Sequence, residues 1–288
     1  QRDGRAERRE LGLQAEHRRI LTRPIRAAPQ GPGAQGASHR IARMGEIPQF
    51  SAEMLTGRSR AHIVDVPEPR CSLHRDVVAP FLALRSSAKS DGIDLVPASS
   101  FRDFERQLAI WNGKCRGERE LLDAAGHPLD ARALDEDALV DAILVWSALP
   151  GASRHHWGTD FDVFDAAAAP PGYRVRLVPE EFAPGGVFGK LGQWLDANAA
   201  KHGFFRPYAV FRGGSRPEPW HLSHAAVAGA AMEQFQPRML QQALESASLD
   251  AMPAVRRRLP ELFARYVSNI DAPRDGGIGH AVTSTRPV

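Results

Sequence analysis

A fourteen-residue stretch, "ASRHHWGTDFDVFD" (152–165), contains two histidines and three aspartates. Imidazole and carboxylate groups are the side chains that bind zinc in catalytic sites, where three protein ligands leave one coordination position for water. His155 and Asp162 supply two such ligands, seven residues apart, with Gly158 between them. This spacing is too long for one helical turn and favours a loop that enters a strand.

A second group of residues, in "EPWHLSH" (218–224), would complete the site. If this segment is extended, Glu218 and His221 point in different directions, so His221 can hold the metal while Glu218 reaches its water. Zinc lowers the pKa of a bound water to about 7, and a nearby carboxylate can accept the proton that this water releases. The residue types therefore predict metal-assisted hydrolysis.

Three blocks of the sequence resemble the VanY-type D-alanyl-D-alanine carboxypeptidases, which belong to the LAS group of zinc peptidases. "SRHHWGTDFD" (153–162) is similar to the family pattern SxHxxGxxxD, and "EPWH" (218–221) is similar to ExWH. "SSFRDFERQ" (99–107) is similar to a third family pattern, SxxRxxxxQ. The blocks follow the family's order, and the resemblance extends over roughly residues 71–235.

The resemblance implies a catalytic zinc centre with one Zn²⁺ per chain. The metal ligands would be His155, Asp162 and His221. Glu218 would act as general base and then as general acid, and Arg102 would stabilise the oxyanion that develops on the peptide carbonyl. An arginine suits this role because it is always charged and offers several donors.

The reaction implied by the family is removal of the C-terminal D-alanine from a peptidoglycan stem peptide or its soluble fragment. Ser99, Ser153 and Gln107 would bind and orient this substrate. Two alternatives stay open: an L,D-carboxypeptidase or endopeptidase of the same group, and a zinc-holding module that binds wall peptides without catalysis. The presence of both Glu218 and Arg102 argues against the second alternative, because a purely structural site needs neither.

Asp160 departs from the family pattern, in which the residue two positions before the ligand aspartate is usually small. The segment 160–165 comes close to alternating polar and apolar residues, as a strand does, so Asp160 and Asp162 face the same side. Residue types alone allow either aspartate to be the ligand, and the family spacing from His155 favours Asp162. Asp160 would then accept an N–H from a ligand histidine, or it would have a surface or capping role.

Two further histidines lie close to these motifs. His156 is not expected to bind the metal, because a residue adjacent to His155 does not normally share the same ion. His224 either begins a helix or contacts substrate. Neither residue enters the predicted metal centre.

The pattern of the remaining chain predicts an α+β fold, and the resemblance implies a small, mostly antiparallel sheet flanked by helices. Amphipathic spacing favours helices over 73–89, 103–112, 139–146, 187–201 and 224–268, the last with breaks at Pro237, Pro253 and Pro260. Strands are expected near 93–100, 160–165, 203–214 and 218–224. Asp103 occupies a good N-cap position for the second of these helices.

Composition divides the chain into a predicted disordered basic tail (1–44), a zinc peptidase domain (45–250) and a C-terminal helix and tail (251–288). Residues 1–44 contain ten arginines and four acidic residues, a net charge of +6, whereas the whole chain is +3 and the remainder is therefore −3. A basic tail could bind nucleic acid, but the net negative charge of the remaining residues makes a nucleic-acid partner unexpected. The oligomeric state is not indicated.

The sequence shows neither a membrane-spanning run nor the apolar core of a signal peptide. The family substrate lies outside the cytoplasmic membrane, so the compartment stays open between periplasm or cell wall and cytoplasm. Two cysteines, Cys71 and Cys115, are too few for a disulfide framework, and we expect free thiols.

Overall fold

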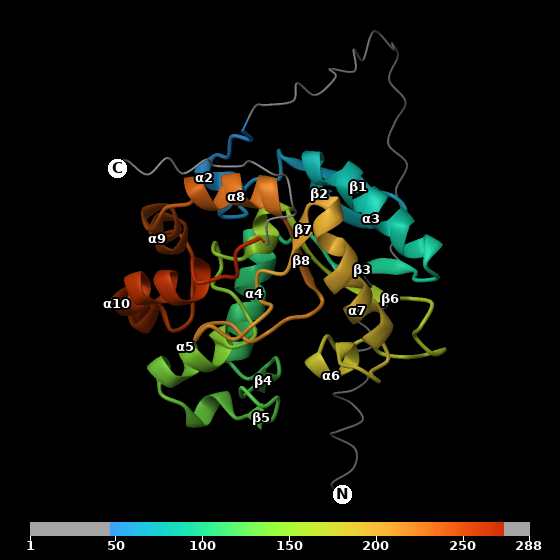
Figure 1. Cartoon of the computed structure of the whole chain (residues 1–288). Coiled ribbons are helices and arrows are strands. Elements are labelled where there is room, and N and C mark those ends of the chain that lie inside the picture. Colours follow the sequence, from blue (N-terminus) through green and yellow to red (C-terminus); the bar gives the residue numbers. More distant parts are fainter. Residues whose placement is uncertain (1–46, 274–288) are drawn as a thin grey trace, which may run out of the picture. The chain divides into compact units, whose positions relative to one another are not determined.

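The computed structural model describes residues 47–273, and within this range a four-stranded antiparallel sheet lies at the centre of the fold (Figure 1). Its strands run in the order β3 (Leu95–Ser99), β6 (Asp160–Asp165), β8 (His221–His224) and β7 (Phe204–Phe205). Every neighbouring pair is antiparallel. The predicted α+β class and antiparallel sheet are therefore confirmed.

The register of the sheet brings the sequence motifs together. Asp162 on β6 is paired with His221 on β8 and with Ser99 on β3. The predicted alternation of β6 is present, because Phe161 and Val163 are completely buried in the hydrophobic core on the opposite side from the aspartates. The sheet thus exposes its polar face to the site and its apolar face to the core.

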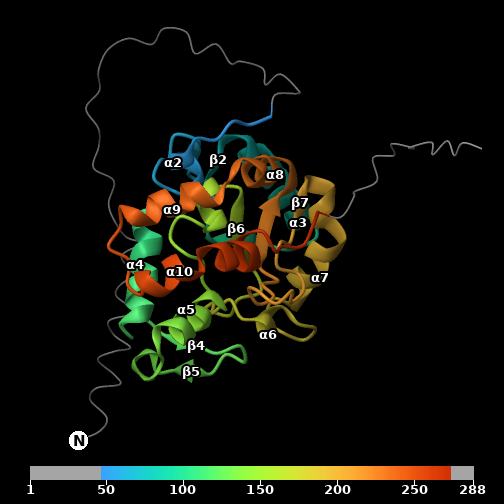
Figure 2. The same ribbon diagram turned by 90° about the vertical axis from the view of Figure 1, so that its left-hand side faces the viewer.

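Helices and two small hairpins surround this sheet. The helices are α2 (Ala52–Leu55), α3 (Val78–Ser90), α4 (Phe104–Cys115), α5 (Glu136–Leu144), α6 (Pro179–Phe182), α7 (Gly189–Asn198), α8 (Ala225–Gln234), α9 (Pro237–Glu245) and α10 (Met252–Leu262). The hairpins pair β1 (Ile63–Val66) with β2 (Cys71–His74), and β4 (Leu121–Leu122) with β5 (Pro128–Leu129). Figures 1 and 2 both place α4, α5, α9 and α10 in a group away from α3 and α7.

The helix α4 begins where the sequence predicts. The Asp103 carboxylate accepts a hydrogen bond of 2.7 Å from the backbone N–H of Arg106, which satisfies one of the free donors at the helix N-terminus. Because α4 follows β3 directly, the block 99–107 lies partly on the strand and partly on the first turn of the helix. This connection sets Arg102 and Gln107 beside the sheet.

Two sequence expectations about helices are wrong. The helix expected over 73–89 begins only at Val78, because residues 71–74 form β2 and pair with β1. Pro260 does not break the last helix, since it lies inside α10, and a π-helical turn, Phe263–Val267, follows. Prolines at the first turns of α9 and α10 do begin helices, where their missing N–H is not needed.

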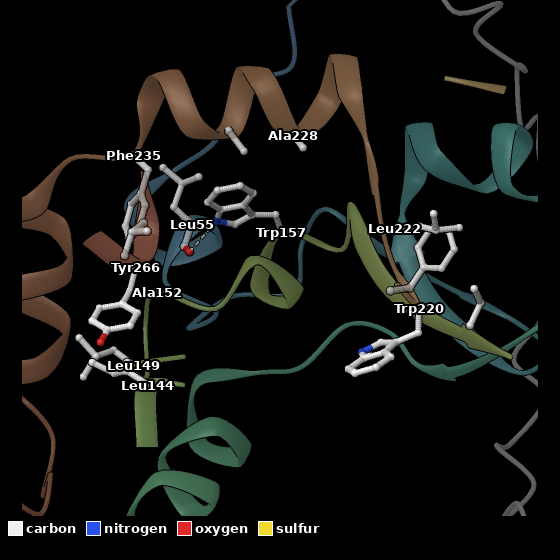
Figure 3. Packing of buried hydrophobic residues seen from close by; sticks show 14 of the residues in the cluster. Leu55, Leu144, Leu149, Ala152, Trp157, Trp220, Leu222, Ala228, Phe235 and Tyr266 are labelled. Carbon is white, nitrogen blue, oxygen red and sulfur yellow. Dashed lines mark hydrogen bonds between the residues drawn. The ribbon is translucent and has the colours of Figure 1, made fainter. Parts of the chain in front are cut away.

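The hydrophobic core is formed by residues from nearly every element and includes Val255 and Leu262 of α10. Figure 3 shows Trp157 inside this core, where its indole N–H donates to the Leu55 carbonyl at 3.1 Å. Trp220, also buried, lies elsewhere in the same cluster. Burial of these tryptophans fixes the backbone on both sides of the metal-ligand motifs.

Residues 1–44, expected to form a basic tail, lie outside the described residues, as does the end of the chain from 274. Both cysteines are free thiols, which confirms the expectation. Within residues 47–273, no helix has the length and apolar character needed to cross a membrane.

Candidate metal centre and active site

The three predicted ligands converge at one point of the sheet. Asp162 lies on β6, His221 begins β8, and His155 belongs to the short 3-10 turn Arg154–Trp157 that precedes β6. All three are buried, and one potential ligand atom from each lies within 4.8 Å of the others. His155 Nε2 is 3.5 Å from Asp162 Oδ2, and His221 Nδ1 is 3.2 Å from Asp162 Oδ1.

The geometry of these atoms fits zinc. Two ligands bound at about 2.0–2.1 Å to a tetrahedral ion are themselves roughly 3.3 Å apart, which agrees with the observed separations. Asp162 Oδ1 and His221 Nδ1 are buried and have no hydrogen-bond partner of acceptable geometry. A cation would satisfy both atoms, and two imidazoles with one carboxylate form the donor set of a catalytic zinc site.

The second nitrogen of each ligand histidine is held by an acceptor. His155 Nδ1 lies 3.0 Å from the Ser100 carbonyl, and His221 Nε2 lies 3.0 Å from Asp160 Oδ1. Because both partners accept, these nitrogens donate, which leaves His155 Nε2 and His221 Nδ1 with lone pairs for a metal.

Gly158 makes the turn between the first two ligands possible. It ends the 3-10 turn with φ 65°, a left-handed conformation that favours glycine. A Cβ at this position would lie 2.7 Å from the backbone nitrogen of His74 and would also collide with Ile63. The glycine therefore allows β2 to approach closely while the chain turns from His155 into β6.

A buried polar network lies behind His221. Arg154 Nε donates to Asp160 Oδ1 at 2.7 Å, and Arg154 Nη2 donates to Ser223 Oγ at 2.7 Å. Asp160 Oδ2 accepts hydrogen bonds from Ser223 Oγ at 3.1 Å and from Thr159 Oγ1 at 2.5 Å. Both oxygens of Asp160 are thus occupied, and one of them accepts the N–H of His221, as the sequence predicts for a supporting residue. Arg154 is the buried positive charge that balances Asp160, and no sequence pattern indicates it.

Charges in this cluster shift several pKa values. Burial by itself would raise the pKa of Asp160, but Arg154 and the hydrogen bond from His221 hold it well below its usual range. Burial would likewise raise the pKa of Asp162, but the neighbouring His155 and His221 lower it. Both carboxylates are therefore ionised, and Asp162 offers a negative charge to a cation at the ligand cluster.

Glu218 faces the same centre from the loop before β8. Its Oε2 lies 3.2 Å from His221 Nδ1, and its side chain is 16% exposed. Burial raises the pKa of Glu218, although the adjacent His221 ring opposes that shift. A carboxylate with a raised pKa beside a metal site is suited to general acid–base chemistry near neutral pH.

Arg102 is held on several sides. Its Nη1 donates to Gln107 Oε1 at 2.8 Å, and its backbone N–H donates to the His155 carbonyl at 3.2 Å. Burial lowers the pKa of Arg102 and Asp162 partly opposes this, but a guanidinium remains charged. The structure thus brings Arg102 to the metal centre that its sequence block predicts.

The three residues expected to bind substrate differ in position. Ser153 is buried and lines the cavity described below. Gln107 is completely buried and bridges Arg102 to the Ala148 carbonyl, while Ser99 Oγ donates to Asp162 Oδ2 at 2.6 Å. Gln107 and Ser99 therefore contact Arg102 and Asp162, and their predicted contact with substrate stays a prediction.

His156 and His224 lie outside the metal centre. His156 is completely buried, in contrast to an ordinary surface histidine, and its Nδ1 donates to the Arg102 carbonyl at 2.6 Å. Burial lowers its pKa to about 3, so it is neutral and also accepts the N–H of Gly151 at 3.0 Å. His224 stands at the start of α8, the helix-start position that the sequence analysis allows.

A cavity of about 840 Å³ opens onto these groups. Its walls include segments 144–149, 176–180 and 215–218 together with Tyr208 and Tyr266. The volume suits a ligand of peptide size.

Tyr208 is a cavity residue that the sequence analysis did not single out. Its ring centre lies 5.0 Å from that of His221. Burial raises the pKa of Tyr208 to about 12, so its phenol is a neutral hydrogen-bond donor. Only the fold reveals this position, because no sequence spacing links Tyr208 to the motifs.

Comparisons with known proteins point to one family. A family model described as VanY, D-alanyl-D-alanine carboxypeptidase, matches residues 70–227, more than half of the 288-residue chain. An uncharacterized protein of Haemophilus influenzae is 50% identical over 104 residues, which are 35% of this chain and 71% of the relative. A D-alanyl-D-alanine carboxypeptidase of Enterococcus faecalis is 27% identical over 157 residues, 53% of this chain and 48% of the relative.

A solved structure is also similar. It is a mutant of the vancomycin resistance D,D-pentapeptidase VanY from a VanB-type resistance cassette, in complex with Zn(II). The match has 20% sequence identity and a TM-score of 0.40, and covers 67% of this chain and 88% of that one.

Proposed function

The chain belongs to the VanY family of D-alanyl-D-alanine carboxypeptidases, and from this premise we propose that it removes the C-terminal D-alanine from peptidoglycan stem peptides. The observation that carries the proposal is the convergence of His155, Asp162 and His221 beside Glu218 and Arg102, in one cavity of peptide size. Three buried ligands next to a base and a fixed cation are what peptide hydrolysis requires.

One Zn²⁺ per chain is part of this proposal. His155 Nε2, one oxygen of Asp162 and His221 Nδ1 would hold it, since the other nitrogens of both histidines already donate to acceptors. When bound, zinc supplies a Lewis acid that polarises a carbonyl group and makes water more acidic.

Glu218 would move the proton in the reaction. It accepts a proton from the water that attacks the peptide carbonyl carbon, and it then passes that proton to the leaving amine as the C–N bond breaks. Its raised pKa supports both steps, because the carboxylate accepts a proton more readily than an exposed glutamate does. The products are the shortened peptide and free D-alanine.

Arg102 would stabilise the negative charge that develops on the carbonyl oxygen. Gln107 and the backbone contact to His155 fix this guanidinium before substrate binds, so little reorganisation is needed during the reaction. Ser153 lies in the cavity wall, where it can contact the peptide directly.

The decisive experiment is incubation of the zinc-loaded protein with defined tetrapeptide and pentapeptide stems, followed by mass spectrometry. We expect loss of the terminal D-alanine from the pentapeptide and an unchanged tetrapeptide. Cleavage of the tetrapeptide alone would establish an L,D-carboxypeptidase instead, and cleavage inside the stem an endopeptidase.

A Glu218→Gln variant is the control for the assigned base. It should bind zinc like the parent and release no measurable D-alanine, because glutamine cannot accept the proton. If the parent protein binds zinc and stem peptide but cleaves nothing, it is a binding module and the proposed reaction is wrong.

A further inference from the structure

The arginines of the cavity differ in their partners. Arg102 and Arg154 are hydrogen-bonded to other side chains, and Arg176 is exposed to solvent. Arg216 also lines the cavity, but its Nε atom is buried and has no hydrogen-bond partner. Among residues 47–273 its guanidinium makes no ion pair and no side-chain hydrogen bond. A buried donor without a partner in a cavity wall is typical of a site that receives a ligand.

The position of Arg216 is fixed by its surroundings. Its backbone N–H donates to the Val145 carbonyl at 3.1 Å, and its guanidinium lies over the Phe211 ring, 4.9 Å from the ring centre. Arg216 precedes Glu218 by two residues, a span of roughly 7 Å at most along the chain. Both residues line the same cavity, so a group held by Arg216 shares that cavity with the proposed catalytic base.

The chemistry of Arg216 selects an anionic group. A guanidinium that stacks on an aromatic ring keeps its N–H edge free, and this planar edge matches the two oxygens of a carboxylate. The cavity carboxylates nearest the metal centre, Asp162 and Glu218, already contact the ligand histidines. They leave Arg216 available to an incoming anion.

We propose that Arg216 binds a carboxylate group of the substrate and thereby sets which peptides are cleaved. This inference rests on the proposed function of the same cavity. A stem peptide offers two sources of this group: the C-terminal carboxylate of the leaving residue, and a side-chain carboxylate further inside the peptide. Either source would place the scissile bond relative to Glu218.

The test compares Arg216→Met with the parent protein on three matched pentapeptides. The first has both carboxylates free, the second has a C-terminal amide, and the third has its acidic side chain converted to an amide. Arg238→Met on the exposed surface of α9 removes the same charge away from the cavity and serves as control. The kcat/KM of each protein is measured at equal zinc content.

Arg216→Met should lower kcat/KM for the free pentapeptide by roughly 10- to 100-fold, and Arg238→Met should leave it unchanged. The loss should disappear for the one amide that removes the carboxylate held by Arg216, which identifies its source. Arg216→Lys, which keeps the charge but not the planar fork, should recover part of the activity and shows that folding is intact.

Two results would overturn the inference while the proposed function stands: equal losses on all three peptides, or no loss on any of them. If the parent protein cleaves no pentapeptide at all, the proposed function fails, and the role of Arg216 fails with it.

Discussion

At the residue scale, Arg154 and Asp160 form a completely buried ion pair directly behind the proposed ligand His221. A carboxylate that accepts the outer N–H of a ligand histidine fixes the ring and makes its other nitrogen a better metal ligand. Arg154 makes such a carboxylate possible in the core, because it neutralises a charge that burial would otherwise oppose.

This pair predicts a distinctive mutational pattern. Asp160→Asn should destabilise the fold by about 3–5 kcal/mol, since it leaves the Arg154 charge buried without a partner. The double variant Asp160→Asn with Arg154→Met should recover most of that stability, yet bind zinc about 10- to 100-fold more weakly than the parent. Urea unfolding and chelator competition measure the two effects. Unchanged zinc affinity in the double variant would show that Asp160 does not support His221 as a zinc ligand.

Protons and zinc should compete for His221. Burial would lower the pKa of His221, but its hydrogen bond to Asp160 and the nearby carboxylates of Asp162 and Glu218 raise it well above its usual value, so the free protein carries an imidazolium at pH 7. Burial lowers the pKa of His155 to about 4, so that ring is already neutral. Zinc binding at pH 7 should therefore release about one proton per ion, and zinc affinity should rise with pH.

Calorimetry of zinc binding in buffers of different ionisation enthalpy counts the released protons. Zinc binding without proton release at pH 7 would show that His221 is neutral in the free protein, contrary to this reading of the cluster.

At the element scale, the segment after α10 holds the loop that forms one wall of the cavity. Asp271 Oδ2 accepts the backbone N–H groups of Ala209 at 2.8 Å and Val210 at 3.0 Å, and the Asp271 N–H donates to the Pro207 carbonyl at 2.9 Å. Arg265 Nε donates to the Gly213 carbonyl at 2.6 Å. These contacts orient the chain that leads through Tyr208 towards Glu218.

Loss of the Asp271 hydrogen bonds should make this wall of the cavity more mobile without changing zinc binding. We expect Asp271→Ala to cost about 1–3 kcal/mol of stability and to lower kcat/KM, with zinc content unchanged. Asp271→Asn keeps one acceptor oxygen and should fall between alanine and the parent. Thermal unfolding and peptide hydrolysis test this order, and equal activity in all three proteins would show that the wall needs no anchor.

The helices and strands also differ in how well the sequence alone predicts them. Local patterns were sufficient for β6, whose polar and apolar residues nearly alternate, and for the start of α4, whose cap is Asp103. They could not predict that Ser223 meets Asp160, because that contact depends on the register between β6 and β8. Burial of Gln107 between Arg102 and a backbone carbonyl is likewise a consequence of packing, so its sequence spacing alone could not indicate these two contacts.

At the scale of the whole molecule, the proposed metal centre joins segments that are far apart in the sequence. His155 lies before β6, whereas His221 begins β8, yet the centres of their rings are only 5.0 Å apart. An ion that binds only when these segments are assembled stabilises the folded chain by mass action.

Zinc should therefore raise the unfolding temperature. At free zinc about 100 times its Kd the stabilisation is about 2.7 kcal/mol, or roughly 5–10 °C for a chain of this size. Differential scanning calorimetry with zinc and with a chelator measures the shift. The shift should be lost in His155→Ala and kept in Arg238→Met, and an equal shift in both variants would place the ion elsewhere.

The central claim is that His155, Asp162 and His221 bind the catalytic zinc, with Asp160 behind them. The most direct test is a crystal structure of the zinc-loaded protein with anomalous data collected at the zinc edge. The account predicts one strong peak about 2.0–2.2 Å from His155 Nε2, an Asp162 oxygen and His221 Nδ1. A peak bonded to Asp160, or none among these three side chains, would contradict it.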